Sequence, residues 1–171
     1  MPSTLLYWPS WVGKSTIWAM LAQMEWRKHI DTDREFTSIH GDIWEFIRKY
    51  GIEEFRIEEW KILQEYIQTW SIVSLWWWTL LLPENQELAN SARIITLMTD
   101  KETIVTRILW DQINHRPLAQ SEYEIRKLYD NRYGHYMSQP IILHISPRET
   151  PEQIATNVQR AQFGRKLLTL V

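Results

Sequence analysis

The sequence predicts an α/β protein with a five-stranded parallel sheet that is covered by helices on both faces, a P-loop-kinase-like three-layer sandwich. Short apolar segments alternate with longer segments of helical spacing, as expected for parallel strands joined by helices. The first apolar segment also leads through a turn into Gly13-Lys14-Ser15-Thr16, which has the context of a phosphate-binding loop. The 171 residues, 44% of them hydrophobic and 23% charged, suffice for one domain spanning residues 1–171.

Each element is indicated by local pattern. Strands are expected where apolar and β-branched residues form short runs, at Thr4–Tyr7, Lys28–Asp31, Ser71–Leu75, Arg93–Met98 and Ile141–Ile145. Helices are expected at Lys14–Glu25, in three pieces of Thr32–Gln68 separated by Gly41 and Gly51, from Pro83, and at Lys101–Gln112, Ser121–His135 and after Thr150. The polar segment Asn114–Gln120 contains a proline and is expected to be a loop.

Composition excludes several function classes. The formal net charge is −2, so no general basic field indicates a nucleic-acid or anionic-membrane partner. No cysteine is present, which excludes disulfides, thiolate zinc sites and cysteine nucleophiles. The most apolar run, Ile72–Leu82, is too short to span a bilayer, and the first residues do not resemble a signal peptide. We therefore expect a cytoplasmic protein, and a monomer, that acts on small molecules. The five histidines have no metal-ligand spacing and are expected to be structural or on the surface.

The segment from Gly13 to Thr16 carries the strongest chemical signal. Lys14 can reach the outer phosphates of a nucleotide, the Ser15 hydroxyl can hold Mg²⁺, and the helix offers free N–H groups to the anion. The alternative is that these residues only start a helix. The full loop pattern has glycine at the position of Trp8, and Trp11 lies inside the loop, so the sequence departs from the pattern where backbone must approach phosphate.

Several further segments match one family over essentially the whole chain. They are Ile30-Asp31-Thr32-Asp33-Arg34-Glu35, Tyr50-Gly51-Ile52-Glu53-Glu54-Phe55-Arg56 with Glu59, Leu82-Pro83-Glu84-Asn85, Arg116-Pro117-Leu118 and Arg132. In this order and spacing, together with the Gly13 segment, they resemble a shikimate kinase. The resemblance implies a small P-loop kinase that transfers the γ-phosphate of ATP, with Mg²⁺, to the 3-hydroxyl of shikimate. It also implies a substrate-binding insertion at about residues 32–68 and a lid at about residues 111–124.

The resemblance assigns roles to individual residues. Gly13, Lys14, Ser15, Thr16, Arg116 and Arg148 would bind ATP, with Ser15 and Asp31 at the metal. Asp33 would bind the hydroxyls of shikimate and help to activate the nucleophile, and Arg56 and Arg132 would clamp its carboxylate. Lys14 and Arg116 would act on the transferred phosphoryl group together with Asp33. Bidentate arginines suit a carboxylate, and cations and a metal suit phosphoryl transfer.

Plainer interpretations stay open for these residues. Arg56 and Glu59 lie three residues apart on one helical face, so Glu59 can fix the guanidinium, or the two can be a solvated surface pair. Asp31 and Asp33 can be caps at a strand-to-helix turn. Arg132 can be a surface residue of a polar helix.

The tryptophans are the main departure from the family. Eleven Trp stand against five Gly, and Trp76, Trp77 and Trp78 replace the three glycines that close the family's third strand. Trp18 and Trp26 also stand at usual glycine positions. We expect Trp76–Trp78 to fill part of the substrate site and to weaken phosphorylation of shikimate. The alternative function is therefore a non-catalytic or engineered kinase-fold protein with a blocked ligand site.

Overall fold

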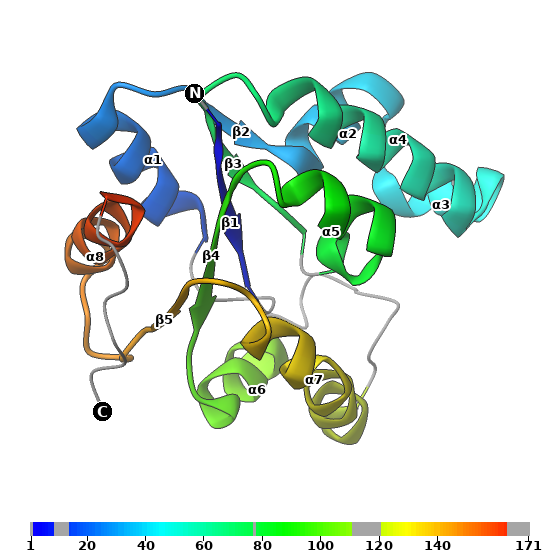
Figure 1. The fold of residues 1–171 in the computed structure, drawn as a ribbon. Coiled ribbons are helices and arrows are strands. Elements are labelled where there is room, and N and C mark those ends of the chain that lie inside the picture. The colour runs from blue at the N-terminus through cyan, green and yellow to red at the C-terminus, as the bar shows by residue number, and fades with distance from the viewer. Residues whose placement is uncertain (1, 9–13, 77, 111–120, 164–171) are drawn as a thin grey trace.

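The computed structural model describes residues 2–8, 14–76, 78–110 and 121–163. Its five strands form one parallel sheet in the order β2-β3-β1-β4-β5, so the predicted fold class is confirmed (Figure 1). The strands are β1 (Thr4–Tyr7), β2 (His29–Asp31), β3 (Ile72–Ser74), β4 (Arg93–Met98) and β5 (Ile142–His144). Each lies within one residue of its predicted bounds.

The helices follow the predicted order. They are α1 (Lys14–Glu25), α2 (Thr32–His40), α3 (Ile43–Tyr50), α4 (Ile52–Tyr66), α5 (Pro83–Ala89), α6 (Lys101–Trp110), α7 (Glu122–Met137) and α8 (Pro151–Phe163), with a short 3₁₀ turn, η1, at Thr79–Leu81. Thr150 begins α8 as predicted, because its hydroxyl accepts from the N–H of Gln153 while the Gln153 side chain accepts from the N–H of Thr150. None of the helices in the described ranges is long and apolar enough to cross a membrane.

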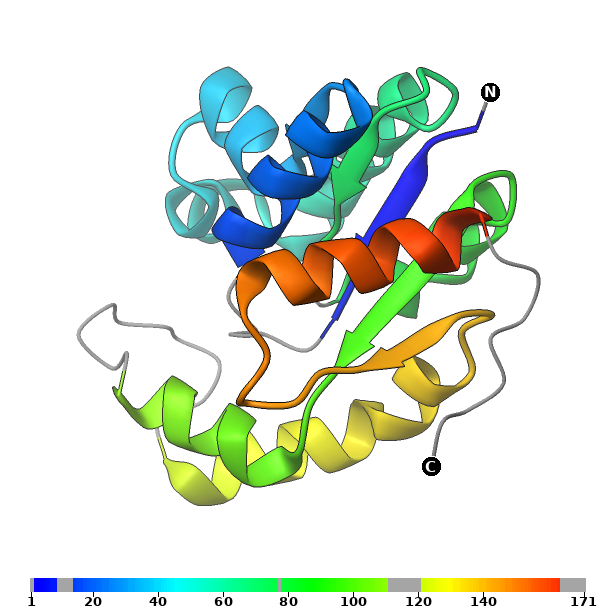
Figure 2. The same ribbon diagram turned by 90° about the vertical axis from the view of Figure 1, so that its left-hand side faces the viewer.

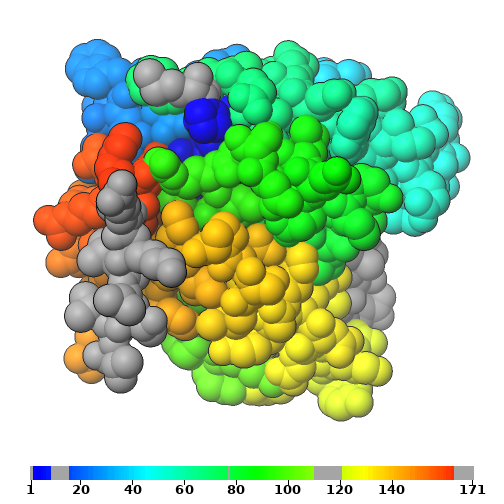
Figure 3. Space-filling model, in the orientation of Figure 1, coloured from blue at the N-terminus to red at the C-terminus, as the bar shows by residue number. Residues whose placement is uncertain are grey.

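Strand β1 divides the core into two layers because successive side chains point to opposite faces. Leu6 and Trp8 belong to one apolar cluster, with residues of α1 and α8, and Leu5 and Tyr7 belong to the other. Figure 2 shows α8 crossing the first face beside α1. On the second face, α5 and the end of α7 form a continuous surface (Figure 3), and the side chain of Gln139 donates to that of Gln86 at 3.0 Å.

Residues 32–66 form the three-helix insertion α2–α4 beside β2 and β3 (Figure 1). Gly41 and Gly51 end α2 and α3 at φ of 85° and 92°, values that glycine adopts without strain, so the predicted helix breaks are confirmed. The insertion has its own apolar cluster, in which Phe36 and Phe55 pack at a ring distance of 4.8 Å. Trp76 and Trp78 join that cluster from the end of β3.

A buried polar network closes the edge of the sheet where the strands begin. The guanidinium of Arg27 donates to the side chains of Thr4, Glu25 and Gln162 and to the carbonyl of Ser71, at 2.7 to 3.0 Å. Arg27 is only 8% exposed. We refer to these five residues as the Arg27 network. The network links β1, α1 and α8 with the residue that precedes β3. Nε2 of Gln162 also donates to Oε1 of Glu25 at 2.8 Å.

Candidate active site at the carboxyl ends of the strands

The carboxyl ends of β1, β2 and β3 stand level with one another. Ser74 of β3 is in register with Leu6 of β1 on one side and with Asp31 of β2 on the other. The Thr32 hydroxyl donates to the carbonyl of Ser74 at 2.9 Å, which ties the start of α2 to the end of β3. In open parallel sheets ligands bind outside these ends, so this edge is the candidate site.

The nucleotide-binding prediction places its residues at the start of α1. Lys14 and Ser15 are the first two residues of that helix, which follows the central strand β1, and Thr16 is exposed. The first turn of a helix has N–H groups without intrahelical partners, and these suit a phosphate. Gly13 lies outside the described residues. Trp8, directly after β1, is buried and stacks on Trp18 of α1 at a ring distance of 3.9 Å.

Asp31 and Asp33 lie at the junction of β2 and α2. Oδ1 of Asp31 accepts hydrogen bonds from the N–H groups of Asp33 at 3.0 Å and Arg34 at 3.4 Å, so the capping interpretation is confirmed for Asp31. Asp33 is partly buried in the first turn of α2. The metal role of Asp31 and the substrate role of Asp33 stay predictions, and a capping carboxylate is compatible with either.

Arg56 and Glu59 form an ion pair in a nearly dry environment. Nη1 of Arg56 donates to Oε2 of Glu59 at 3.1 Å, and the side chains are 17% and 4% exposed. The solvated-pair interpretation is therefore wrong. The Thr79 hydroxyl donates to Oε1 of Glu59 at 2.6 Å. Burial raises the pKa of Glu59, while the bonds from Thr79 and Arg56 lower it. Glu59 thus holds Arg56 and also fixes η1 after the third strand.

Arg132 approaches the same region from α7. Burial lowers its pKa to about 10, against the opposing influence of Tyr136 and Tyr7, and the positive charge of Arg56 lowers it further. Arg56 is the smallest of these influences, and the convergence of the two predicted carboxylate-binding arginines on one cleft stays a prediction. Tyr7 and Tyr136 pack against each other at a ring distance of 5.3 Å, and burial raises the pKa of both phenols. Arg132 is partly buried and is therefore not a simple surface residue.

The tryptophans after β3 occupy this edge. Trp76 and Trp78 are 5% and 4% exposed and pack against each other at 4.3 Å. Cζ of Arg56 lies 4.6 Å from the centroid of the Trp78 ring. Trp44 of α3 lies 5.9 Å from Trp76 and 6.0 Å from Trp78. Trp76 and Trp78 are therefore buried at this edge of the sheet. Their expected place in the substrate site stays a prediction, and Trp77 lies outside the described residues.

Sequence reasoning missed four residues that shape the site. Thr79 reaches Glu59 only through η1, and Tyr7 and Tyr136 surround Arg132 from two distant elements. Trp44 gave no signal beyond aromatic residues at helical spacing. Arg148 is exposed in the turn between β5 and α8, and Arg116 and the predicted lid up to residue 120 lie outside the described residues.

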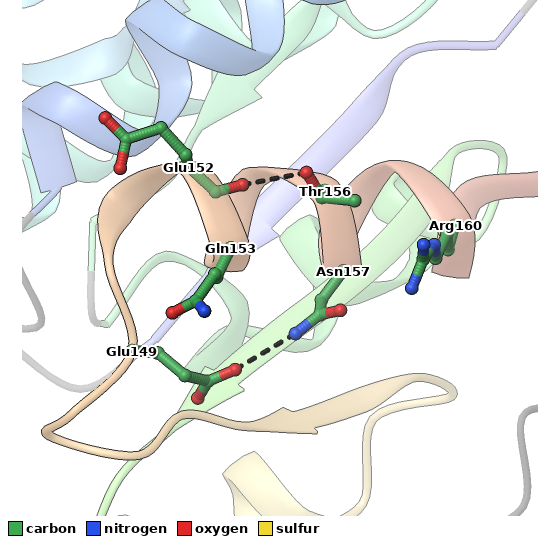
Figure 4. A pocket seen from close by; sticks show the side chains of 6 residues that line it. All are labelled: Glu149, Glu152, Gln153, Thr156, Asn157 and Arg160. Atoms are coloured by element: carbon green, nitrogen blue, oxygen red, sulfur yellow. Dashed lines mark hydrogen bonds between the residues drawn. The ribbon is translucent and has the colours of Figure 1, made fainter.

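A surface pocket of about 420 Å³ lies elsewhere, along α8. Two of its lining side chains bond to neighbours in the chain: Nδ2 of Asn157 donates to Glu149, just before α8, and the Thr156 hydroxyl donates to the carbonyl of Glu152 (Figure 4). No predicted site residue lines it. In the described part of the chain, no three His, Asp or Glu residues gather as a metal site either. A nucleotide-bound Mg²⁺ takes most of its ligands from phosphates and water, so one hydroxyl and one carboxylate suit it.

Comparison with known proteins agrees with this arrangement. The family model described as Shikimate kinase matches residues 11–162. A shikimate kinase of Lactococcus lactis subsp. lactis is 29% identical over 154 residues, which cover 89% of this chain and 92% of that protein.

Solved structures show the same fold. The shikimate kinase from Acinetobacter baumannii, in complex with shikimate, superposes with a TM-score of 0.81 at 21% identity, covering 98% of this chain and 96% of that one. The shikimate kinase from Aquifex aeolicus gives 0.78 at 21% identity, covering 95% and 96%. A gluconokinase from Sinorhizobium meliloti gives 0.62 at 13% identity, covering 94% and 90%. Since the family model spans residues 11–162, most of the chain, this chain belongs to the shikimate kinase family, a family of kinases.

Proposed function

We propose that this protein is a shikimate kinase, which transfers the γ-phosphoryl group of ATP to the 3-hydroxyl of shikimate. The observation that carries the proposal is the nearly buried ion pair of Arg56 with Glu59, within a chain of the shikimate kinase family. A guanidinium group held by Glu59, with Arg132 as the proposed second one, suits a small carboxylate anion.

The substrate side of the mechanism follows from these residues. Arg56 and Arg132 hold the carboxylate. Asp33, in the first turn of α2, accepts the proton of the 3-hydroxyl while the hydroxyl oxygen attacks the γ-phosphorus and ADP leaves. Glu59 acts as a positioning residue, because its two oxygens engage Arg56 and Thr79. Phosphoryl transfer depends mainly on positioning and charge stabilisation, so an arginine that is held in place by Glu59 contributes directly.

The nucleotide side places ATP at the N-terminus of α1. Lys14 would bind the outer phosphates, and Ser15 and Asp31 would hold the Mg²⁺. Mg²⁺ supplies charge neutralisation of the phosphates when bound. Supporting this fit, α1 starts at Lys14 directly beyond the central strand. Thr16, Arg148 and Arg116 complete the proposed nucleotide set, and the role of Arg116 stays a prediction from the resemblance.

We further propose that the protein is cytoplasmic and monomeric. Size-exclusion chromatography with light scattering tests the oligomeric state.

The direct experiment measures ADP release in a coupled assay with ATP, Mg²⁺ and shikimate, and with gluconate in place of shikimate. We expect turnover that depends on shikimate and a phosphorylated product detectable by mass spectrometry. Turnover with gluconate alone contradicts the proposed substrate, and binding of neither nucleotide nor shikimate contradicts the proposed function. The comparisons favour the kinase over a protein with a blocked site, and they do not favour impaired activity. The buried indoles at the site therefore need an explanation of their own.

A further inference from the structure

Trp26 ends α1 in a backbone conformation that is unfavourable for tryptophan. Its φ is 54°, and the N–H of the next residue, Arg27, donates to the carbonyl of Ala22 at 3.1 Å. This is the closing bond of a Schellman motif, in which the left-handed residue is usually glycine. The Trp26 side chain is 92% exposed, so burial of the indole does not offset the strain.

Trp70 has the same property in the turn between α4 and β3. Its φ is 56°, and its carbonyl accepts from Nε of Arg27 at 3.0 Å, so the Arg27 network fixes this backbone. In the described part of the chain, the other residues at positive φ are Gly41 and Gly51. The non-glycine residues at positive φ in that part are therefore both tryptophan. A bulky side chain in this region is a genuine outlier.

Trp76 and Trp78 stand at unusual positions for a different reason. Both indoles are buried at the end of β3, where the proposed substrate would contact the backbone. Nε1 of Trp76 is buried and has no hydrogen-bond partner among the described residues, and burial of such a donor is costly. The Trp78 ring covers the guanidinium of Arg56 at 4.6 Å. The two indoles thus lie where the proposed substrate would bind.

Trp8 and Trp18 repeat this pattern at the nucleotide side. The two rings stack at 3.9 Å between the end of β1 and the first turns of α1. Nε1 of Trp18 is also buried without a hydrogen-bond partner in the ranges that the structure describes. Trp8 stands at the first glycine position of the phosphate-binding pattern. The space filled by this stack adjoins the residues proposed to bind ATP.

Trp44 and Trp60 behave differently. They lie within the helices α3 and α4, and both are partly buried. Neither has a positive φ. The described tryptophans therefore include a group that fits its surroundings and a group at positions with the character of glycine.

We propose that six tryptophan positions are glycine positions and that the enzyme made in its own cell carries glycine there. They are Trp8, Trp18, Trp26, Trp70, Trp76 and Trp78. A single codon that appears as tryptophan in this sequence but is translated as glycine in the cell would account for all six positions together. Trp44 and Trp60, encoded by another codon, would stay tryptophan. The inference goes beyond the proposed function. It also explains how a chain of a kinase family can have indoles in its ligand site.

The first test compares glycine with alanine at one exposed position. Trp26→Gly and Trp26→Ala both remove the indole, but only glycine relieves the left-handed backbone. We expect the midpoint of thermal unfolding to be about 2–4 °C higher for W26G than for W26A, and the same order for W70G and W70A. Trp60→Gly and Trp60→Ala provide the matched control, because glycine inside α4 is less stable than alanine. Equal midpoints for W26G and W26A overturn the proposal.

The second test identifies the residues in the natural protein and does not depend on the folding of any variant. The protein is purified from the cells whose genome encodes it, digested, and sequenced by mass spectrometry across positions 26, 60 and 70. We expect glycine at 26 and 70 and tryptophan at 60. Tryptophan at 26 and 70 overturns the proposal. Neither test measures kinase activity, so a failure here is distinguishable from a failure of the proposed function.

Discussion

Nη1 of Arg56 donates a hydrogen bond to Oε2 of Glu59 at 3.1 Å, one turn apart on the buried side of α4. Because the Thr79 hydroxyl holds the other carboxylate oxygen at 2.6 Å, the pair connects the three-helix insertion to the segment after β3. Two elements far apart in the sequence are thereby joined through one carboxylate. The position of the guanidinium depends on both.

Arg56→Ala is expected to weaken shikimate binding selectively. Loss of the arginine from a desolvated pair with the substrate carboxylate costs about 2–5 kcal/mol. The KM for shikimate should therefore rise by about 30-fold or more, with the Kd for Mg-ATP within twofold of wild type. Steady-state kinetics and nucleotide titration measure the two quantities. Lys61→Ala is the matched control, since Lys61 pairs with Glu58 at 2.7 Å on the exposed side of the same helix. An equal effect in both variants contradicts the role of Arg56.

Glu59 is expected to make stability depend on pH in an unusual direction. Burial raises its pKa above the ordinary value of 4.5, so the folded state holds this proton more tightly than the unfolded state. The contribution of Glu59 to stability is present at low pH and is lost as pH rises through the raised pKa. Relative to Glu59→Gln, the wild-type protein should therefore lose stability as pH rises above the ordinary pKa of 4.5.

Glu58→Gln gives the opposite sign and serves as the control. The hydrogen bond from Lys61 lowers the pKa of Glu58, so its contribution is present above the ordinary pKa and is lost as pH falls. Thermal unfolding midpoints of the three proteins at pH values below and above the ordinary pKa provide the measurement. Parallel curves for E59Q and E58Q would contradict the assigned environment of Glu59.

Asp31→Asn separates the capping role of Asp31 from its proposed role at the metal. Asparagine caps a helix about as well as aspartate, so D31N should keep the unfolding midpoint of the wild type, whereas Asp31→Ala should lose about 1 kcal/mol. If the carboxylate acts near Mg²⁺, D31N should also need a higher Mg²⁺ concentration for half-maximal turnover. An unchanged Mg²⁺ dependence in D31N would contradict the metal role and leave helix capping as the role of Asp31.

Arg27→Ala should destabilise the protein strongly. The variant leaves the buried carboxylate of Glu25, 5% exposed, without its cation, and a broken buried pair costs about 3–5 kcal/mol. Denaturant unfolding measures the loss. Arg48→Ala is the control, because Arg48 and Glu45 are 72% and 75% exposed and 4.0 Å apart. A loss in R27A as small as that in R48A would show that the network contributes little.

Local sequence signals predicted most of the fold. Gly41 and Gly51 indicated the helix ends at which they stand, and apolar runs indicated all five strands to within one residue. Asp31 and Thr150 act through neighbours two or three residues away, and such contacts can be anticipated from spacing. The bond of Thr79 to Glu59 spans twenty residues and depends on how η1 packs against α4, so it has no local signature.

The candidate site shows the same division. The residues that the family resemblance named at the edge of the sheet could be predicted, but the influence of Arg56 on Arg132 depends on the approach of α7. The backbone of Trp26 and Trp70 gave no signal either, because tryptophan does not indicate a left-handed conformation. The family resemblance marked Trp26 as a usual glycine position, whereas Trp70 was identified only by its positive φ in the structure.

The Arg27 network has a consequence for how the molecule can change shape. It fastens the starting ends of β1 and β3 to α1 and α8, so that half of the sheet serves as an anchored base. We therefore expect the backbone at this end of the two strands to move less on ligand binding than the backbone at the opposite edge. Backbone amides beside the network, such as those of Thr4 and Ile72, should exchange their hydrogens only when the whole domain unfolds.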